Sequence, residues 1–567
     1  MVVVGGGVVG AGTALEAAAR GLRVALVEKG DFANCTSSRS TKLIHGGVRY
    51  LEQAFKTLDY SMINLVTEAL HERSHMLNSC SYMNKPLPIL IPLNKWWEIP
   101  YMYIGTKFYE FFAGKSNNTP KSYYLSRDEA LKQFPMLKGD NLKGAIVYFD
   151  GQMNDARHTL ALALTAESKG AAIANYVAVE GLIKEGTIEQ AADKESYAKM
   201  PVRGVVARDA LTGKELRIRA KTVINATGPF SDAIRKMDNP DARPYVIPAT
   251  GVHVVLTKKY CADKLGMLIP KTSDGRLLFL LPWENNTLVG TTDAQGELSD
   301  LPKPSIEDVD FIINNVKQYI NTPIERSDVN AVWAGLRPLV LDPKAASKGT
   351  KSLSRQHLVL VEPSGLVSIL GGKYTTYRKM AEDAVNAAVD FVASQPGGDN
   401  VFSIPLDQAK ASVTFNMPLL GADKDGTVCA SNYSTLESFL VKLRGAPPDV
   451  ASHLVRNYGV RALHVVDYMY KQAEKSKTSP WKRLSDAHPY LETEVLYSVD
   501  CEAAQRLEDV LCRRTRLAFV DAAAANLVAD KVANMMAEPL GWNAERKQSE
   551  LARLDQVMRT MDVSKLQ

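Results

Sequence analysis

Three glycines near the start of the chain have the spacing that a dinucleotide-binding turn requires. Gly5, Gly7 and Gly10 directly follow a short apolar run. Gly5 and Gly7 allow a tight turn and close backbone approach, and Gly10 lets the following helix lie near the sheet. Glu28 comes 18 residues after Gly10, where a carboxylate accepts hydrogen bonds from ribose hydroxyl groups. These residues predict a dinucleotide whose pyrophosphate lies on free N–H groups at the start of the helix.

The elements that must position this turn are visible on both sides of it. Residues 2–4 are valines and predict a short buried strand. Four alanines in residues 11–18 keep the following helix thin, and Gly21 comes after its end. Residues 24–27 are apolar and predict a second parallel strand that ends at the acidic residue. Strand, helix, strand and carboxylate therefore occur in the order that the site needs.

Length and composition fit a large soluble enzyme with two or three domains. The chain has 567 residues, of which 46% are hydrophobic. Its 68 basic and 63 acidic residues leave a net charge of +5, which is too small to favour nucleic acid. This charge is compatible with an anionic substrate or membrane surface. The six cysteines show no CxxC and no metal-ligand spacing, so we expect reduced structural thiols and no metal site.

Targeting is not readable from this sequence. No apolar run approaches the roughly 18 residues that span a bilayer. No signal peptide or arginine-rich presequence precedes the first strand. Because a nucleotide-binding strand rarely begins at the first residue, we expect that upstream sequence has been removed.

Three later segments bear on which dinucleotide is bound. Residues 36–51 form a polar stretch with a glycine pair, and alone they would be a hydroxyl-rich loop capping a helix. Residues 223–229 predict an apolar strand that ends in Ala-Thr-Gly. In FAD proteins of the two-dinucleotide-fold type, such a late strand returns to the cofactor. Residues 367–378 predict a strand, a glycine turn and a helix, without the GxxxxGK[ST] spacing of a phosphate loop.

Six motifs follow one another along the chain: HGGVRYL at 45–51, YFDGQMNDAR at 148–157, INATGPF at 224–230, LPWENNTLVGTTD at 281–293, GLRPLV at 335–340 and GGKYTTYR at 371–378. Together they resemble the FAD-dependent glycerol-3-phosphate dehydrogenases. The stretches PLPILIPLNKWWEIPY at 86–101 and RRTRLAF at 513–519 are similar to the mitochondrial branch of that family. The sequence has no D-x-[DN]-x-[DN]-G loop with a distal glutamate, so we expect no calcium activation.

The resemblance implies an α/β FAD-binding domain of the two-dinucleotide-fold type, Rossmann-like and related to glutathione reductase and D-amino-acid oxidase. An inserted mixed-sheet substrate domain and a helical C-terminal domain complete the expected fold. We expect the oxidoreductase domain at 1–400 and the helical domain at 410–567. The FAD-binding parts are placed at about 1–80, 150–235 and 330–395, and the substrate-binding parts at about 81–149 and 236–329.

Two patterns after residue 410 indicate amphipathic helices. Asp509 and Arg513 have the spacing of a helical ion pair. Four apolar residues have the spacing of one helical face: Val495, Val499, Ala503 and Leu507. The Arg513–Arg516 run is expected to be a solvated or interdomain face, with contact to anionic lipid as the alternative.

The implied reaction is oxidation of sn-glycerol 3-phosphate to dihydroxyacetone phosphate by hydride transfer to FAD. Arg49, Arg337 and Lys373 match the positions of the family's substrate-phosphate groups, and guanidinium groups bind phosphate oxygens in pairs. The alternative for both arginines is a surface salt bridge. Lys373 also lies at a helix N-terminus, where a cation opposes the helix dipole and an anion nearby would resolve the conflict.

The resemblance further implies which residues contact FAD. Ser37 and Ser38 are expected at the pyrophosphate, and the backbone of Gly46 and Gly47 near the flavin. Thr227 and Gly228 end the returning strand. The N–H groups after Gly372, around Tyr374 and Thr375, are expected to face the flavin N1–C2=O edge, where negative charge accumulates on reduction.

His45 is the candidate proton acceptor, because imidazole titrates near neutral pH and His45 lies four residues before Arg49. The alternative is a histidine with a purely structural role in the core or a turn. Asp155 and Arg157 belong to a family motif, but we favour a structural ion pair that orients the domains.

The route by which electrons leave the flavin is suggested by an aromatic stretch at 86–112. Its prolines break any spanning helix, and lysines lie among the aromatic residues. One alternative is the apolar wall of the substrate domain. The other is an interfacial patch that lets ubiquinone approach the flavin from the membrane. With the resemblance, this predicts a peripheral protein of the mitochondrial inner membrane, facing the intermembrane space, and leaves a homodimer open.

Four functions remain open at this point. The first is the quinone-linked dehydrogenase, and the second is a glycerol-phosphate oxidase that passes electrons to oxygen and yields hydrogen peroxide. A third is another flavin amine or hydroxy-acid oxidase, for which three cations around one carboxylate would be excessive. The fourth is a flavin-loaded structural or membrane-scaffold protein without enzymatic activity.

Overall fold

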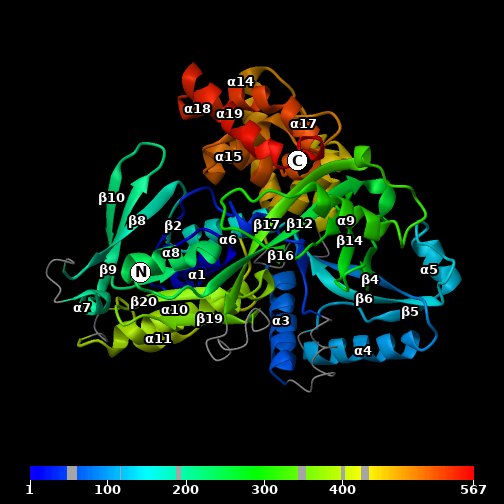
Figure 1. Ribbon diagram of the computed structural model, residues 1–567. Helices are drawn as coiled ribbons and strands as arrows, with labels where there is room; N and C mark the ends of the chain where they lie inside the picture. Colours follow the sequence, from blue (N-terminus) through cyan, green and yellow to red (C-terminus); the bar gives the residue numbers. More distant parts are fainter. Residues whose placement is uncertain are drawn as a thin grey trace.

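The computed structural model describes residues 1–47, 60–114, 117–186, 193–341, 353–354, 356–397, 402–422 and 433–566. Two β-sheet regions lie side by side in Figure 1, and the orange and red C-terminal helices pack across them. This arrangement confirms the predicted α/β fold with a mixed sheet and a helical C-terminal part. The exact domain limits stay a prediction.

A six-stranded sheet carries the predicted dinucleotide turn. Its order is β19-β20-β11-β1-β2-β7, in which β19 is antiparallel to β20 and the other neighbours are parallel. The central strands are apolar and buried, as parallel strands covered on both faces require. The bounds are β1 Val2–Val4, β2 Ala25–Val27, β7 Ala172–Ala174, β11 Val223–Asn225, β19 His357–Val361 and β20 Leu366–Gly371.

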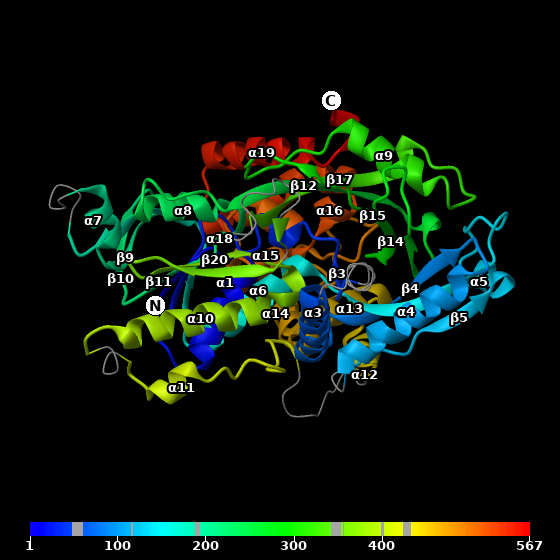
Figure 2. The same cartoon turned by 60° about the horizontal axis from the view of Figure 1, so that its bottom comes forward.

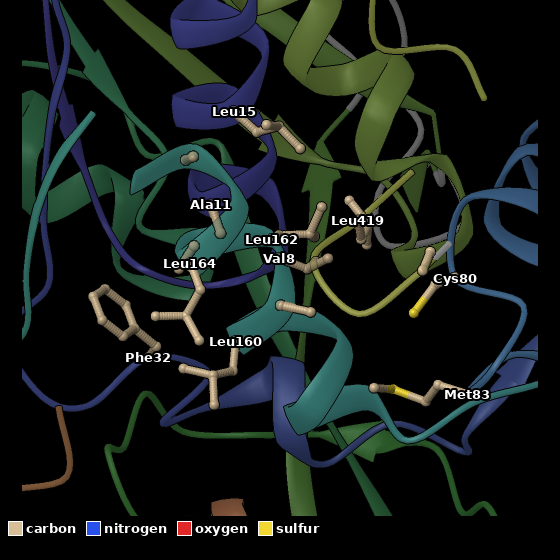
Figure 3. Close-up of a cluster of buried hydrophobic side chains, with 14 of the residues drawn as sticks. Val8, Ala11, Leu15, Phe32, Cys80, Met83, Leu160, Leu162, Leu164 and Leu419 are labelled. Carbon is tan, nitrogen blue, oxygen red and sulfur yellow. The ribbon is translucent and has the colours of Figure 1, made fainter. Parts of the chain in front are cut away.

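Three helices pack closely together on this sheet because one of them carries mostly small side chains. Helix α1 (Val8–Ala19) packs against α6 (Asp155–Ser168) and α10 (Tyr377–Ser394). A Cβ atom on Gly12 would lie 2.7 Å from Cδ2 of Tyr377, so a larger residue would push α10 away. Figure 3 shows the core around α1, where Ala11 and Leu15 lie near the leucines of α6.

A three-stranded antiparallel sheet extends the same region. It contains β8 (Val177–Lys184), β9 (Val202–Asp209) and β10 (Glu215–Arg219). Helices α7 (Lys194–Lys199) and α8 (Ser231–Asp238) accompany it. The start of β8 and one side of α8 face the cavity described below.

The second large sheet is mixed, as predicted for the inserted domain. Its main order is β18-β17-β12-β15-β14-β13-β4-β6-β3; β16 pairs with β12, β5 pairs with β6, and β4 runs parallel to β13. The bounds are β3 Leu43–Ile44, β4 Lys85–Leu93, β5 Tyr123–Ser126, β6 Gly144–Gln152, β12 Val246–Thr257, β13 Gly266–Ile269, β14 Leu278–Trp283, β15 Asn286–Gly290, β16 Ala294–Gln295, β17 Val329–Leu341 and β18 Leu353–Ser354. Its helices are α3 Tyr60–Ser79, α4 Glu98–Ala113, α5 Arg127–Gln133 and α9 Ile306–Val316.

The C-terminal region is helical, as expected. Its helices are α11 Leu406–Lys410, α12 Tyr433–Arg444, α13 Pro448–Tyr458, α14 Ala462–Ser476, α15 Glu492–Glu502, α16 Leu517–Val520, α17 Ala522–Leu527, α18 Ala529–Leu540 and α19 Ala544–Arg559, and a π-helix at Asp509–Arg514. Figure 2 shows α19 and α10 on opposite sides of the molecule. The Asp509–Arg513 ion pair is confirmed.

One expectation for this region was wrong, and of the alternatives for the Arg513–Arg516 run the interdomain face is confirmed. The predicted apolar face does not belong to one helix, because α15 ends at Glu502 and Ala503 adopts a left-handed φ of 55°. The Arg513–Arg516 run is neither solvated nor available to lipid. Arg513, Arg514 and Arg516 are 5%, 3% and 1% exposed, because acidic and carbonyl groups of the first domain bind them.

Candidate active site

One cavity of about 500 Å³ lies where the six-stranded sheet meets the mixed sheet. Its wall contains the turn before α1, residues between Glu28 and Thr41, the ends of β11 and β20, and the middle of β12 and β17. Pockets for small molecules and cofactors usually enclose about 300–1,000 Å³. The cavity therefore joins the predicted dinucleotide turn to the predicted substrate residues.

The glycine turn has the geometry that its sequence predicts. Gly5 has a φ of 106°, and a Cβ atom there would lie 2.7 Å from the Ala226 carbonyl oxygen. A Cβ atom on Gly10 would lie 1.7 Å from the Gly5 carbonyl oxygen, so Gly10 packs on the turn itself. Gly5 and Gly7 line the cavity, whereas Gly10 lies behind them. No larger residue fits at Gly5 or Gly10 without moving the start of α1.

Glu28 lines the cavity at the end of β2, but its carboxylate is already engaged. Its oxygens accept hydrogen bonds from the Gly6 N–H at 2.6 Å and the Gly30 N–H at 2.8 Å. Burial raises the pKa of Glu28, and these two N–H groups partly offset that effect. Glu28 thus braces the glycine turn, and a hydrogen bond to ribose would come in addition.

The two serines expected at the pyrophosphate have different positions. Ser37 lines the cavity, and its Oγ accepts a hydrogen bond of 2.9 Å from the Val8 N–H in the first turn of α1. Ser38 lies behind the wall, because its hydroxyl donates to the Cys35 carbonyl oxygen at 3.1 Å. The structure therefore favours Ser37 alone at the cofactor.

The returning strand β11 reaches the cavity as expected. Thr227 and Gly228 both line it, and Gly228 has a φ of 56° at the start of a short 3-10 helix, Gly228–Phe230. The Thr227 hydroxyl donates to Oδ1 of Asn225 at 2.7 Å, which fixes the end of the strand.

Arg337 lies on β17 and faces the cavity near β12. Its guanidinium pairs with Asp293 at 2.8 Å and also donates to Thr291 Oγ1 at 2.9 Å and to the Thr292 carbonyl oxygen at 3.1 Å. The side chain remains 29% exposed. The surface salt bridge considered from sequence is thus present, but it orients an arginine that lines the cavity.

Lys373 also lines the cavity, directly after the β20 turn. Gly371 and Gly372 have φ angles of 74° and 80°, which turn the chain into a 3-10 helix at Tyr374–Thr376 and then α10. Gly372, Lys373, Tyr374 and Thr375 all line the cavity. The Tyr374 hydroxyl donates to the Asp155 carbonyl oxygen at 2.7 Å, so this turn is anchored to α6.

His45 lines the cavity after β3 and is half-buried. Its carbonyl oxygen accepts a hydrogen bond of 3.4 Å from Thr375 Oγ1, which brings two predicted segments together. Gly46 and Gly47 lie beside the wall; the Gly46 N–H donates to the Tyr109 hydroxyl at 2.8 Å. Arg49, the remaining predicted phosphate ligand, lies outside the described residues.

Sequence reasoning missed His253, which lies on β12 and lines the cavity. Its Nε2 shares a hydrogen bond of 2.9 Å with Thr41 Oγ1, and its ring stacks on Trp333 with centroids 5.5 Å apart. Burial, helped by Lys42 and Arg337, lowers the pKa of His253 well below its ordinary value. No signal in the sequence indicated a functional role of His253, because this residue occupies an inward position in an otherwise apolar strand.

Arg39 is a second residue that the sequence did not reveal. It is 8% exposed and lines the cavity, and its Nη1 donates to the Ala334 carbonyl oxygen at 3.0 Å. In the described part of the chain Arg39 has no carboxylate partner and its Nε has no hydrogen bond. A buried guanidinium without a counterion fits an anionic ligand, and with the glycine cradle it fits the pyrophosphate-containing FAD.

Asp155 and Arg157 do not pair with each other. Asp155 binds Lys42 at 2.7 Å and Arg516 at 3.2 Å, whereas Arg157 binds Glu502 at 2.6 Å. Each residue nevertheless joins α6 to the C-terminal region. The expected structural role in domain orientation agrees with these contacts, although the predicted pair is replaced by two separate ones.

Comparison with known proteins places this chain among flavoenzymes. The sequence profile described as FAD dependent oxidoreductase matches residues 1–378, and that of the C-terminal domain of alpha-glycerophosphate oxidase matches residues 412–547. Mitochondrial glycerol-3-phosphate dehydrogenase of Rattus norvegicus is 46% identical over 553 residues, which is 97% of this chain and 72% of the relative. The protein of that name in Homo sapiens is 44% identical with the same coverage.

A solved structure is similar over the whole chain. The glycerol-3-phosphate dehydrogenase from Bacillus halodurans, complexed with FAD, has a TM-score of 0.76 and 28% sequence identity. The similarity covers 100% of this chain and 95% of that one. The resemblance stated from motifs, the fold class and the FAD cofactor are thereby confirmed.

Proposed function

Because this chain belongs to the family of FAD-dependent glycerol-3-phosphate dehydrogenases, we propose that it oxidises sn-glycerol 3-phosphate and passes the electrons to ubiquinone. The observation that carries this proposal is the continuous cavity from the glycine turn to Arg337 and Lys373. The glycine turn in its wall suits a dinucleotide, and the two basic side chains in the same wall suit a small anion.

The substrate phosphate is assigned to the basic side chains that line the cavity. Arg337 is held by Asp293, Thr291 and Thr292, so its guanidinium is oriented before substrate arrives. Lys373 lies at the start of the helical turn into α10, where backbone N–H groups add positive potential. Arg49 is proposed as a third phosphate contact on the basis of the family motif alone.

The chemical step needs an acceptor for the hydroxyl proton of the carbinol. When bound, FAD accepts the hydride from the carbinol carbon. We assign the proton to His45, which lines the cavity and lies beside the turn that carries Thr375. His253 lines the same cavity as a neutral imidazole and orients the Thr41 hydroxyl. Ser37, Thr227, Gly228 and Gly372 are proposed to position FAD from the wall of the cavity.

Transfer to quinone is proposed to occur at a membrane surface formed around α4. Large apolar side chains project from this helix and the residues before it, with Trp96 67% and Phe111 74% exposed. The described helices include none that is long and apolar enough to cross a bilayer. Exposed tryptophan and tyrosine favour the interface between headgroups and acyl chains, so contact should be peripheral. The mitochondrial relatives support placement on the inner membrane, and we propose the intermembrane-space side.

The first test is an anaerobic titration of the FAD-loaded protein with sn-glycerol 3-phosphate, followed by reoxidation. Bleaching of the flavin band and reoxidation by a soluble ubiquinone that is faster than by air would support the proposal. Fast reoxidation by air with release of hydrogen peroxide would favour an oxidase instead. That alternative has one specific observation behind it, namely the match of residues 412–547 to the alpha-glycerophosphate oxidase domain. No bleaching would reject this substrate.

Membrane contact has a separate test. Wild-type protein should sediment with phosphatidylcholine–cardiolipin liposomes, and Trp96→Ser with Trp97→Ser should weaken that sedimentation several-fold while leaving flavin reduction by substrate unchanged. A matched control replaces two exposed aliphatic residues on other helices, Leu443 and Leu527, by serine. Equal losses in both double variants would reject the α4 surface.

A further inference from the structure

The segment from Glu28 to Thr41, here called the cofactor segment, forms much of the cavity wall. Glu28, Asn34, Ser37 and Arg39 are among its lining residues. Its only regular element in the structure is the short 3-10 helix at Thr36–Ser38. Because no strand ladder holds this segment, its shape depends on side-chain contacts to neighbouring elements.

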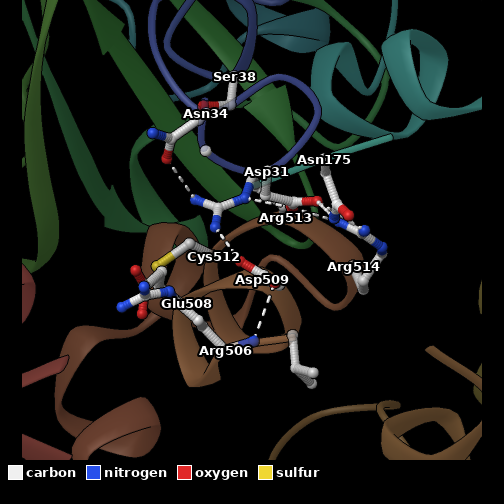
Figure 4. Close-up of polar contacts among 12 residues, drawn as sticks. Asp31, Asn34, Ser38, Asn175, Arg506, Glu508, Asp509, Cys512, Arg513 and Arg514 are labelled. Atoms are coloured by element: carbon white, nitrogen blue, oxygen red, sulfur yellow. Dashed lines mark hydrogen bonds and ion pairs between the residues drawn. The ribbon is translucent and has the colours of Figure 1, made fainter. Parts of the chain in front are cut away.

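The strongest of these contacts come from the C-terminal helical region. Asp31 is fully buried, and Arg514 binds it in two places, Nη1 to Oδ2 at 2.7 Å and Nη2 to Oδ1 at 2.9 Å. Arg513 Nε binds Oδ2 of the same carboxylate at 2.6 Å. Figure 4 shows both guanidinium groups converging on Asp31 from the π-helix at Asp509–Arg514.

The contact extends from Asp31 to residues that line the cavity. Arg513 Nη1 donates to Asn34 Oδ1 at 3.1 Å, and Asn34 lies in the cavity wall. Arg516 Nη2 donates to the Ser38 carbonyl oxygen at 2.9 Å, directly after Ser37. Three arginines of one short C-terminal stretch therefore hold the cofactor segment at its start, middle and end.

Each buried charge in this cluster lies beside a charge of opposite sign. Burial alone would raise the pKa of Asp31, but Arg514 and Arg513 hold it below its ordinary value. Asp509, which binds the other side of Arg513, has its pKa raised by burial and by the nearby Asp31. Nη2 of Arg514 also donates to the Glu502 carbonyl oxygen at 2.7 Å.

Local backbone geometry brings adjacent arginines to one carboxylate. Neighbouring residues of an α-helix point about 100° apart, which separates their side chains. Here the Thr515 N–H bonds to the Val510 carbonyl oxygen at 2.9 Å, five residues back, so the turn is wider than in an α-helix. Such π-helical turns in helices occur frequently at functional sites.

We propose that the C-terminal helical region retains the FAD cofactor, with Arg513, Arg514 and Asp31 as positioning residues. The ion pairs keep the cofactor segment in the shape that places Ser37 at the start of α1 and Asn34 in the wall. None of the three touches the reacting atoms. Their loss is expected to act on the rate at which FAD leaves the protein, not on the chemical step.

The chain contains a matched control for this proposal. Arg157 binds Glu502 in two places, at 2.6 and 2.9 Å, and also donates to the Asn457 carbonyl oxygen at 3.3 Å. Arg514 likewise combines a two-point carboxylate pair with one backbone carbonyl. Both arginines are buried and join the same two regions, but among the described residues Arg157 makes no hydrogen bond or ion pair with the cofactor segment.

The experiment compares Arg514→Lys with Arg157→Lys in the FAD-loaded protein. Lysine keeps the charge but cannot form the two-point pair, so both variants should lose similar thermal stability. FAD release, followed by flavin fluorescence below the unfolding temperature, should accelerate at least tenfold in Arg514→Lys and less than twofold in Arg157→Lys. Excess FAD should return kcat of Arg514→Lys to within twofold of wild type.

Equal release rates in the two variants would overturn the proposal, as would a wild-type rate in Arg514→Lys. If Arg514→Lys does not fold, Arg513→Lys replaces it, because the Arg514 pair then remains in place. Faster FAD release from Arg513→Lys than from Arg157→Lys would support the proposal, and equal rates would reject it.

Discussion

The interdomain cluster and the cavity both contain buried basic side chains, and the two regions differ in how these charges are balanced. In the interdomain cluster, Arg513 and Arg514 share the carboxylate of Asp31. In the cavity, Arg39 has only a backbone carbonyl in the described ranges, and Arg337 stays partly open although it pairs with Asp293. Arg39 is nearly as buried as the two interdomain arginines, whereas Arg337 is more exposed. An arginine that is fully paired with carboxylates of the protein has a structural role. An arginine that lacks such a partner among the residues that the structure describes is suited to bind an anionic ligand.

The largest expected effect breaks the interdomain cluster. Arg514→Met should destabilise the protein by about 3–5 kcal/mol, because it leaves part of the charge of Asp31 buried without its two-point partner. The Michaelis constant for substrate should not change in FAD-saturated protein. Thermal unfolding and steady-state kinetics measure the two quantities. A variant as stable as wild type would show that the cluster contributes specificity of packing rather than stability.

Arg337→Met tests the opposite region and should have the next largest effect. Since Arg337 is proposed to bind the substrate phosphate, its loss should lower kcat/KM for sn-glycerol 3-phosphate roughly 100- to 1,000-fold. The unfolding temperature should change little, because the Asp293 pair is partly exposed. Kinetics with FAD in excess provide the measurement. A large loss of stability with unchanged kinetics would place Arg337 with the structural arginines.

A pH experiment sharpens the comparison through His253. Its pKa is lowered in the folded protein, so below the ordinary value of about 6.5 the unfolded chain binds a proton that the folded protein does not. Stability should therefore fall as pH decreases below 6.5, by up to about 1.4 kcal/mol per unit from this group. His253→Gln should reduce that slope in denaturant unfolding between pH 6.5 and 5. An unchanged slope would contradict this assignment, whereas Asp31 stays charged throughout this range.

The smallest expected effect comes from a neutral member of the cluster. Asn175 Nδ2 donates to Asp31 Oδ1 at 3.1 Å and to the Ala503 carbonyl oxygen at 2.8 Å. Asn175→Ala should cost about 1 kcal/mol of stability, because both arginines still balance Asp31. FAD release should remain within about twofold of wild type. A release rate as fast as that of Arg514→Lys would show that hydrogen bonding, not charge balance, holds the cofactor segment.

Much of the cofactor end could be predicted from sequence because its constraints are local. The glycine spacing predicted a tight turn with close backbone approach, and in the structure Gly5 has a φ of 106° and Gly10 packs against the Gly5 carbonyl oxygen. The Ala-Thr-Gly and Gly-Gly-Lys segments were placed at the cofactor, and Thr227, Gly228 and Gly372 line the cavity. Ser38 was placed there as well but lies behind Ser37, because adjacent residues of a 3-10 helix point to different sides.

The roles of several charged and polar residues could not be predicted. The arginine run at 513–516 was expected to be a solvated or interdomain face, or a lipid contact; the structure shows the interdomain face, but the sequence did not indicate its partner Asp31. His253 and Arg39 carried no motif of their own, since one lies in an apolar strand and the other in a polar loop. Their roles follow from which groups face them in space.

The sequence by itself determined the dinucleotide turn, the flavoenzyme fold and the order of the motifs, because backbone conformation and strand–helix alternation depend on near neighbours in the chain. Only the tertiary structure decided how each charge is used. Besides Asp509, Arg513 binds Asp31, which is 482 residues away in sequence, and Arg337 meets Asp293 across a sheet. A charge is stabilised by whatever lies within a few ångströms of it, and that distance is set by folding rather than by sequence separation.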